Sequence, residues 1–143
     1  MRIILVSHGK LALGMKDTLQ LIVGPRNDVT AYEAYEDGKG DKFIGQIKKL
    51  VSENANEKFV VITDVLGGSV NNEMTSLLKE NRNIYLITGM NLPLVITLAT
   101  KTGEVNSEFI DSVVREGQKG VININQMMNE VASEDSDELW SNW

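Results

Sequence analysis

The sequence of 143 residues contains no cysteine and only one histidine, His8. The absence of cysteine excludes disulfides, thiolate metal ligands and cysteine nucleophiles, and it fits a cytoplasmic protein. Because the usual ligands of a transition metal are histidine and cysteine, one histidine and no cysteine argue against such a site. We expect neither a metal nor a cofactor. Chemistry that needs a nitrogen nucleophile or a near-neutral proton acceptor has His8 as its first candidate.

Long apolar runs and basic clusters are also missing. No apolar run approaches the roughly 20 residues of a membrane helix, and the strand-like N-terminus is too short for a signal peptide. The formal net charge is −6, whereas nucleic-acid binding depends on basic contacts to phosphate, so no nucleic acid is expected as a partner. The P-loop motif, a G-x-G-x-x-G after the first strand and a G-x-S-x-G nucleophile elbow are all absent.

Short apolar runs alternate with amphipathic stretches along the chain. The runs predict strands at residues 2–7, 29–35, 59–63 and 84–88. Apolar residues at helical spacing predict helices at residues 11–23, 41–52, 70–80 and 107–116, with a further helix capped by Asn91. This alternation requires right-handed βαβ crossovers. The predicted fold is therefore a three-layer α/β/α domain, doubly wound around a mostly parallel sheet.

Within the first helix, Leu11, Met15, Leu19 and Ile22 share the face that we expect to be buried. Near the C-terminus, residues 121–124 form a short alternating run that is suited to a strand at the edge of the sheet. A helix is expected at residues 126–132, followed by an acidic run. The sequence thus predicts one domain over residues 1–125 and an acidic C-terminal tail over residues 126–143.

Two loops carry the residues that could do chemistry. His8 follows the first strand, and Asp64 follows the third. In a flavodoxin-like strand order these strands are neighbours, so the two loops would face each other. The Asp64 carboxylate could then accept the proton of one ring nitrogen of His8 and leave the other nitrogen with its lone pair free. This arrangement is typical of an oriented nitrogen nucleophile.

The residues after Asp64 predict an anion site. Gly67, Gly68 and Ser69 lie where the third helix should begin, so that backbone N–H groups and a hydroxyl could meet a phosphoryl group. Each feature has a plainer alternative: His8 as an ordinary loop residue, Asp64 as a turn cap, the glycines as a tight turn. The combination at two adjacent strand ends favours phosphoryl transfer through a phosphohistidine.

Four segments resemble the IIA domain of the mannose-type phosphoenolpyruvate:sugar phosphotransferase system. They are S-H-G at residues 7–9, D-V-L-G-G-S at 64–69 with Asn72, G-M-N-L-P at 89–93 and R-E-G at 115–117. Their order and spacing match the family over about residues 1–124, and the combination is specific.

The resemblance implies a cytoplasmic phosphotransferase component. His8 would accept a phosphoryl group from the phosphocarrier protein HPr and pass it to a separate IIB protein, with the membrane proteins IIC and IID as indirect partners. Asp64 would hold the His8 ring, and Gly67, Gly68 and Ser69 would contact the phosphoryl group. Family members are homodimers that exchange a C-terminal antiparallel strand, which residues 121–124 match.

The chain departs from the family in the second loop. The family often has threonine and an aromatic residue after the aspartate, where this chain has Val65 and Leu66, and Pro-Phe after the serine, where it has Val70 and Asn71. Two alternatives stay open. One is a phosphoryl donor to dihydroxyacetone kinase, and the other is a binding module of the same fold that no longer transfers phosphate.

Overall fold

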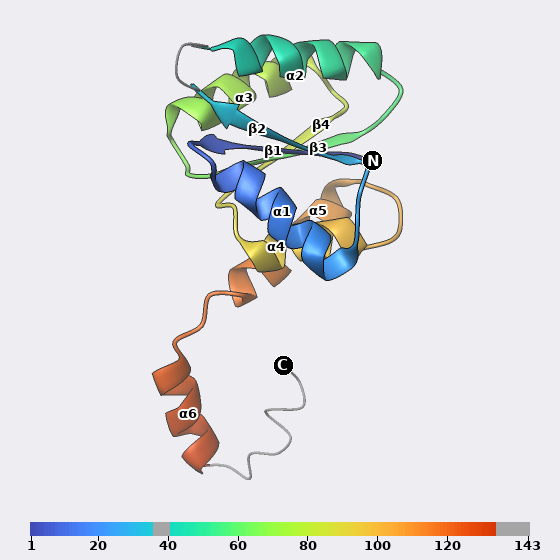
Figure 1. The fold of residues 1–143 in the computed structure, drawn as a ribbon. Coiled ribbons are helices and arrows are strands. Elements are labelled where there is room, and N and C mark those ends of the chain that lie inside the picture. Colours follow the sequence, from blue (N-terminus) through green and yellow to red (C-terminus); the bar gives the residue numbers. More distant parts are fainter. Residues whose placement is uncertain (36–40, 134–143) are drawn as a thin grey trace.

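The computed structural model describes residues 1–35 and 41–133 (Figure 1). The strands are β1 (Arg2–His8), β2 (Val29–Ala34), β3 (Phe59–Thr63) and β4 (Ile84–Thr88). The helices are α1 (Leu11–Val23), α2 (Lys42–Glu53), α3 (Ser69–Glu80), α4 (Leu92–Thr100), α5 (Ser107–Lys119) and α6 (Ile124–Ser133). The four strands and first five helices predicted from the sequence are confirmed, with ends that shift by a few residues.

The described sheet has the strand order β2-β1-β3-β4, and each neighbouring pair is parallel. The predicted adjacency of β1 and β3 is therefore confirmed. Because all four strands run in the same direction, their carboxyl ends lie at one edge of the sheet.

Helices cover both faces of the sheet, and Figure 1 shows the three layers. Side chains alternate between the faces along each strand. In β1, Ile3 and Leu5 belong to the core beneath α1, α4 and α5, whereas Ile4 and Val6 belong to the core beneath α2 and α3. These apolar strands are thus buried on both faces, which is why their sequences are continuous rather than alternating.

The buried face of α1 differs from the prediction. Ala12 and Leu19 are fully buried, and Met15 packs against the same core. Leu11 and Ile22 are about half exposed. The small Ala12 side chain lies against the sheet, so the helix presents a face rotated away from Leu11.

The antiparallel strand predicted at residues 121–124 is not formed in this chain, and within the described residues the sheet is entirely parallel. Residues 121–123 have no regular structure, and α6 begins at Ile124. The segment leads away from the sheet to α6, which stands apart from the three layers (Figure 1). A strand requires a backbone to pair with, and within the described residues this segment pairs with none.

The predicted C-terminal helix is confirmed as α6, which begins two residues earlier than expected. Residues 134–143 of the predicted acidic tail lie outside the described residues. Among the helices in residues 1–35 and 41–133, we find none with the length and apolar character needed to cross a membrane.

Arg26 joins the start of β2 to the end of α4. Its Nε and Nη2 atoms donate to the two oxygens of Asp28 at 2.8 and 2.6 Å, and Nη1 donates to the Ala99 carbonyl oxygen at 2.6 Å. The hydrogen bonds from Arg26 to the Asp28 carboxylate hold the pKa of Asp28 below its usual range, against the effect of burial.

Replacing Asp28 with asparagine should lower the free energy of unfolding by about 1–3 kcal/mol at neutral pH, because charge-assisted hydrogen bonds are lost. The folded-state pKa of Asp28 is depressed. Its contribution is therefore present above the ordinary value of about 3.9 and is lost as the pH falls through the folded-state pKa. Urea unfolding at neutral pH and in acid measures the difference.

The matched control is Glu53→Gln, because Glu53 pairs with Lys49 on the exposed side of α2. Its effect should stay below about 0.5 kcal/mol. An Asp28→Asn variant as stable as the wild type at neutral pH would contradict this role of Arg26.

Candidate functional site

The site forms where β1 and β3 end side by side. Val6 pairs with Thr63 in the sheet, so His8 and Asp64, which follow these residues, emerge at the same edge. The His8 side chain is 48% exposed and that of Asp64 is 10% exposed. The structure therefore presents an accessible imidazole above a nearly buried carboxylate.

Hydrogen bonds from His8 orient its ring on Asp64. One carboxylate oxygen, Oδ2, lies 2.8 Å from ring Nδ1 and accepts the backbone N–H of His8 at 2.9 Å. The other, Oδ1, accepts the backbone N–H of Val65 at 3.0 Å. Burial alone would raise the pKa of Asp64, but these hydrogen bonds outweigh it and hold the pKa below its usual range.

An ionised Asp64 can only accept, so the network assigns the proton of the His8 ring to Nδ1. Nε2 then has the free lone pair, and the Ser69 hydroxyl lies 3.1 Å from it. Both ring nitrogens are thus engaged by the two residues that the sequence placed in the second loop.

The glycines bring the start of α3 against the imidazole. Gly67 has a φ of 76°, which favours glycine, and Gly68 occupies the N-cap of α3 without a side-chain cap. A Cβ atom on Gly68 would lie 3.4 Å from His8 Cε1 and 3.2 Å from Val65 Cγ2. The first N–H groups of a helix have no intrahelical partner, and Gly68 and Ser69 place the start of α3 beside the ring.

A buried polar cluster beneath the site was missed in the sequence. The Thr63 hydroxyl donates to Asn71 Oδ1 at 3.1 Å and lies 2.9 Å from the Thr88 hydroxyl. Thr63 is fully buried and Asn71 nearly so. The cluster ties the ends of β3 and β4 to the first turn of α3, and so fixes the spacing between Asp64 and Ser69. A buried asparagine on a helix has no signature in the sequence.

Two further residues beside His8 were also missed. Ser7 is buried, and its hydroxyl oxygen accepts the backbone N–H of Ala12 at 2.7 Å, which anchors the start of α1 next to the histidine. The ring of Tyr35, which follows β2, lies near that of His8, with ring centroids 6.0 Å apart. The Ser7 contact belongs to the local turn from β1 into α1, whereas Tyr35 approaches His8 only because β2 pairs with β1 in the folded sheet.

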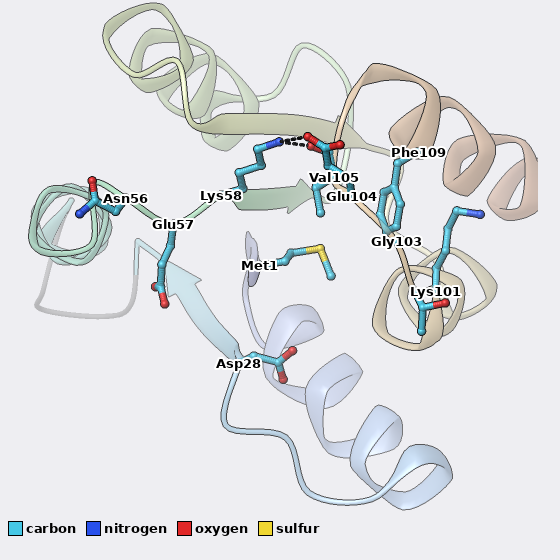
Figure 2. Close-up of a pocket in the computed structure, with 11 residues that line it drawn as sticks. Met1, Asp28, Asn56, Glu57, Lys58, Lys101, Gly103, Glu104, Val105 and Phe109 are labelled. Atoms are coloured by element: carbon cyan, nitrogen blue, oxygen red, sulfur yellow. Dashed lines mark hydrogen bonds and ion pairs between the residues drawn. The ribbon is translucent and has the colours of Figure 1, made fainter.

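A separate cavity of about 730 Å³ lies at the other edge of the sheet, where the strands begin (Figure 2). Several of its charged groups are already engaged. Lys58 donates to the Val105 carbonyl oxygen and lies 3.7 Å from the Glu104 carboxylate, and Asp28 is held by Arg26. The two lysine contacts fasten the loop before α5 to the start of β3 (Figure 2). This cavity is remote from His8 and contributes nothing to its chemistry.

The described part of the chain contains no group of three or more histidine, cysteine, aspartate or glutamate side chains that could hold a metal ion.

Comparison with protein families decides the relationship of the chain. The model of the family described as the PTS system fructose IIA component, EIIA-man, matches residues 2–116. The chain belongs to this family. The expected resemblance to the mannose-type IIA domain is thereby confirmed.

Individual relatives agree with this assignment. The sorbose-specific EIIA component of Klebsiella pneumoniae is 33% identical over 96 residues, which span 66% of this chain and 70% of the relative. The fructose-specific EIIA component of Bacillus subtilis is 23% identical over 99 residues, 66% of this chain and 65% of the relative.

Solved structures share the fold. One from Klebsiella pneumoniae, described as a phosphoenolpyruvate-dependent sugar phosphotransferase system permease, has a TM-score of 0.79 and 32% identity, covering 89% of this chain and 93% of that one. The mannose/sorbose-specific IIA subunit of Enterococcus faecalis has a TM-score of 0.76 and 25% identity, covering 85% and 92%.

The residues at which the chain departs from the usual mannose-type IIA pattern lie at the surface and in the core. Val65 is exposed beside His8, and Leu66 is 81% exposed. Val70 and Asn71 lie in the first turn of α3 and are instead buried. One pair therefore changes the surface around the imidazole, and the other changes the packing beneath it.

Two alanine substitutions should separate the roles of the glycines. Gly68→Ala has an ordinary φ and adds a methyl group against the imidazole, so it should shift the ring signals of His8 in NMR spectra. Gly67→Ala meets no atom but is strained by its positive φ, so it should lower stability by about 1 kcal/mol. Thermal unfolding measures the second effect.

Gly45→Ala in α2 is the control, because it meets no atom within 4 Å and should stabilise the helix. The packing described here would be wrong if Gly68→Ala left the His8 signals unchanged.

Proposed function

We propose that the chain is a cytoplasmic phosphocarrier of a sugar phosphotransferase system, in which His8 accepts a phosphoryl group from phospho-HPr and passes it to a separate IIB protein. The observation that carries the proposal is the engagement of both His8 ring nitrogens, Nδ1 by Asp64 and Nε2 by Ser69, in a half-exposed imidazole. Membership of the IIA family supports the same chemistry.

In this proposal Nε2 is the nucleophile. Its lone pair attacks the phosphorus of the donor phosphohistidine, the donor P–N bond breaks, and that electron pair returns to the donor ring. The His8 imidazole then carries positive charge, which the Asp64 carboxylate stabilises through the Nδ1 proton. Transfer to IIB repeats these steps in the opposite direction, with His8 as the leaving group.

The start of α3 receives the phosphoryl oxygens. The unpaired N–H groups of its first turn and the positive end of the helix dipole favour an anion there. The Ser69 hydroxyl, which lies 3.1 Å from Nε2 in the free protein, turns to a phosphoryl oxygen once Nε2 is occupied. Because Val65 has no hydroxyl, Ser69 and the amides of Gly67 and Gly68 supply these contacts.

Phosphorylation by phosphoenolpyruvate, enzyme I and HPr tests the proposal directly. The wild type should acquire an acid-labile, base-stable phosphate, and His8→Ala should acquire none, because the sequence has one histidine. Asp64→Asn should be labelled roughly 10–100-fold more slowly, since it no longer holds the ring through a carboxylate. An unlabelled wild type or a fully labelled His8→Ala variant would refute it.

The protein that receives the phosphoryl group from His8 distinguishes the main proposal from the two alternatives. Passage of the label to a IIB protein supports sugar transport, whereas passage to a dihydroxyacetone kinase subunit supports the other donor role. Gly67, Gly68 and Ser69 favour the mannose-type branch. A labelled protein that passes phosphate to neither would be a regulatory module, for which Val65 in place of threonine is the supporting feature.

We also propose that the protein is a homodimer that exchanges residues 121–124 as an antiparallel strand. Among the described strands, β4 has a neighbour on one side only. A groove of about 330 Å³ at the end of β4 is lined by residues of β4, α4 and α5 and by Val121. Val121 is 79% exposed, and Ile122 and Ile124 are also exposed. Pairing with β4 of a second copy would bury these side chains and complete the sheet edge.

The double substitution Val121→Lys and Ile122→Lys should convert the dimer to a monomer, because burying two unpaired charges against β4 is unfavourable. Light scattering after size-exclusion chromatography measures the mass. Leu21→Lys is the control: it alters an equally exposed apolar residue on α1 and should leave the dimer intact. A wild type that is monomeric at micromolar concentration would contradict strand exchange.

A further inference from the structure

We propose that the aromatic ring of Tyr35 borders the site and shields the phosphohistidine of His8 from water. The inference rests on the proposed function, in which His8 carries a phosphoryl group. It assigns a role to a residue outside the two loops that the sequence singled out. Three observations carry it: the position of Tyr35, its backbone conformation and the packing of its ring.

The strand order places Tyr35 opposite the phosphoryl-binding loop. β1 lies between β2 and β3, and His8 pairs with Ala34 in the sheet. Tyr35 follows Ala34 directly, so it borders the imidazole from the β2 side, while Asp64 and Ser69 border it from the β3 side. The rings of Tyr35 and His8 have centroids 6.0 Å apart and planes inclined by 38°.

The backbone of Tyr35 is strained. Its φ of 55° is the only positive φ of a non-glycine residue in the described chain. A bulky aromatic residue rarely adopts this conformation, and such strain persists where the surrounding structure imposes it, often at functional sites. Glycine would fit the same backbone without strain, so a side chain at this position has a use that offsets its cost.

Packing holds the strained ring in place. Tyr35 contacts Phe43 edge to face, with centroids 5.2 Å apart, and Phe43 is buried at the start of α2. The Tyr35 ring is therefore supported on one side by the core and faces His8 on the other. Its own exposure of 39% leaves it at the surface of the site.

The reaction to be prevented is hydrolysis. Water attacks phosphorus, and the P–N bond breaks with its electron pair returning to the imidazole. The water oxygen becomes the fourth oxygen of inorganic phosphate, and its protons stay on the phosphate or pass to solvent. His8 is half exposed, so the imidazole does not exclude water by burial alone. An apolar ring beside it removes one approach, and this role needs the ring of Tyr35 but not its hydroxyl.

The test uses phosphoramidate, which phosphorylates histidine chemically and so does not depend on HPr. Because His8 is the only histidine, all label on histidine is at this residue. The wild type, Tyr35→Phe, Tyr35→Ala and Tyr35→Gly are labelled, freed of reagent, and followed for release of phosphate. Their melting temperatures are measured in parallel.

Tyr35→Phe should hold its phosphate as long as the wild type, whereas the alanine and glycine variants should lose it roughly three- to tenfold faster. Tyr35→Gly should melt about 2–4 °C above Tyr35→Ala, because glycine relieves the positive φ, yet both should lose phosphate at the same rate. This pair separates shielding from stability.

Equal phosphate lifetimes in all four proteins would overturn the proposal, as would lifetimes that follow the melting temperatures. The wild type is also offered phospho-HPr in a separate arm. Failure of that arm alone would refute the proposed function while leaving the shielding result intact.

Discussion

The contact between the Asp64 carboxylate and Nδ1 of His8 is the interaction on which the rest of the site depends. His8 is half exposed, so core packing does not fix its ring. The carboxylate does so instead, by accepting both the ring proton and the backbone N–H of the same residue. This double acceptance sets the tautomer, directs Nε2 toward Ser69 and places the negative charge behind the ring. A nitrogen nucleophile gains positive charge as it reacts, and here that charge develops against a carboxylate that stays ionised.

The parallel sheet makes this contact available. Because β1 and β3 are neighbours, two residues 56 positions apart in sequence meet at one edge of the sheet. The start of α3 is brought to the same edge by the short loop after β3. The buried Thr63 and Asn71 side chains, with the partly buried Thr88, fasten it there. The site is thus assembled from strand ends and a helix start, which are more rigid than long loops. The same edge brings Tyr35 from β2 against the other side of the imidazole.

Exposed apolar side chains include those of residues 121–124 and, in the loop after Asp64, those of Val65 and Leu66. The apolar side chains of residues 121–124 are exposed in the single chain, which is costly unless a partner covers them. They lie beyond the family match, which ends at residue 116. Val65 and Leu66 replace the residues that the family often carries beside the histidine, and they give this chain an apolar surface where a hydroxyl and an aromatic ring would lie.

The sequence by itself determined the α/β class, the positions of the strands and the candidate residues His8, Asp64 and Ser69. Apolar runs, helical periodicity and strand-end positions are local signals, and the chain carries them clearly. Only the tertiary structure decided which face of α1 is buried, whether residues 121–124 pair with a strand in the same chain, and which side chains support the site from behind. The contacts of Asn71 with Thr63 and of Tyr35 with His8 form only in the folded chain. Periodicity reports on one segment at a time, whereas burial and backbone strain are properties of the assembled layers, so these residues could be identified only once the sheet had brought its strand ends together.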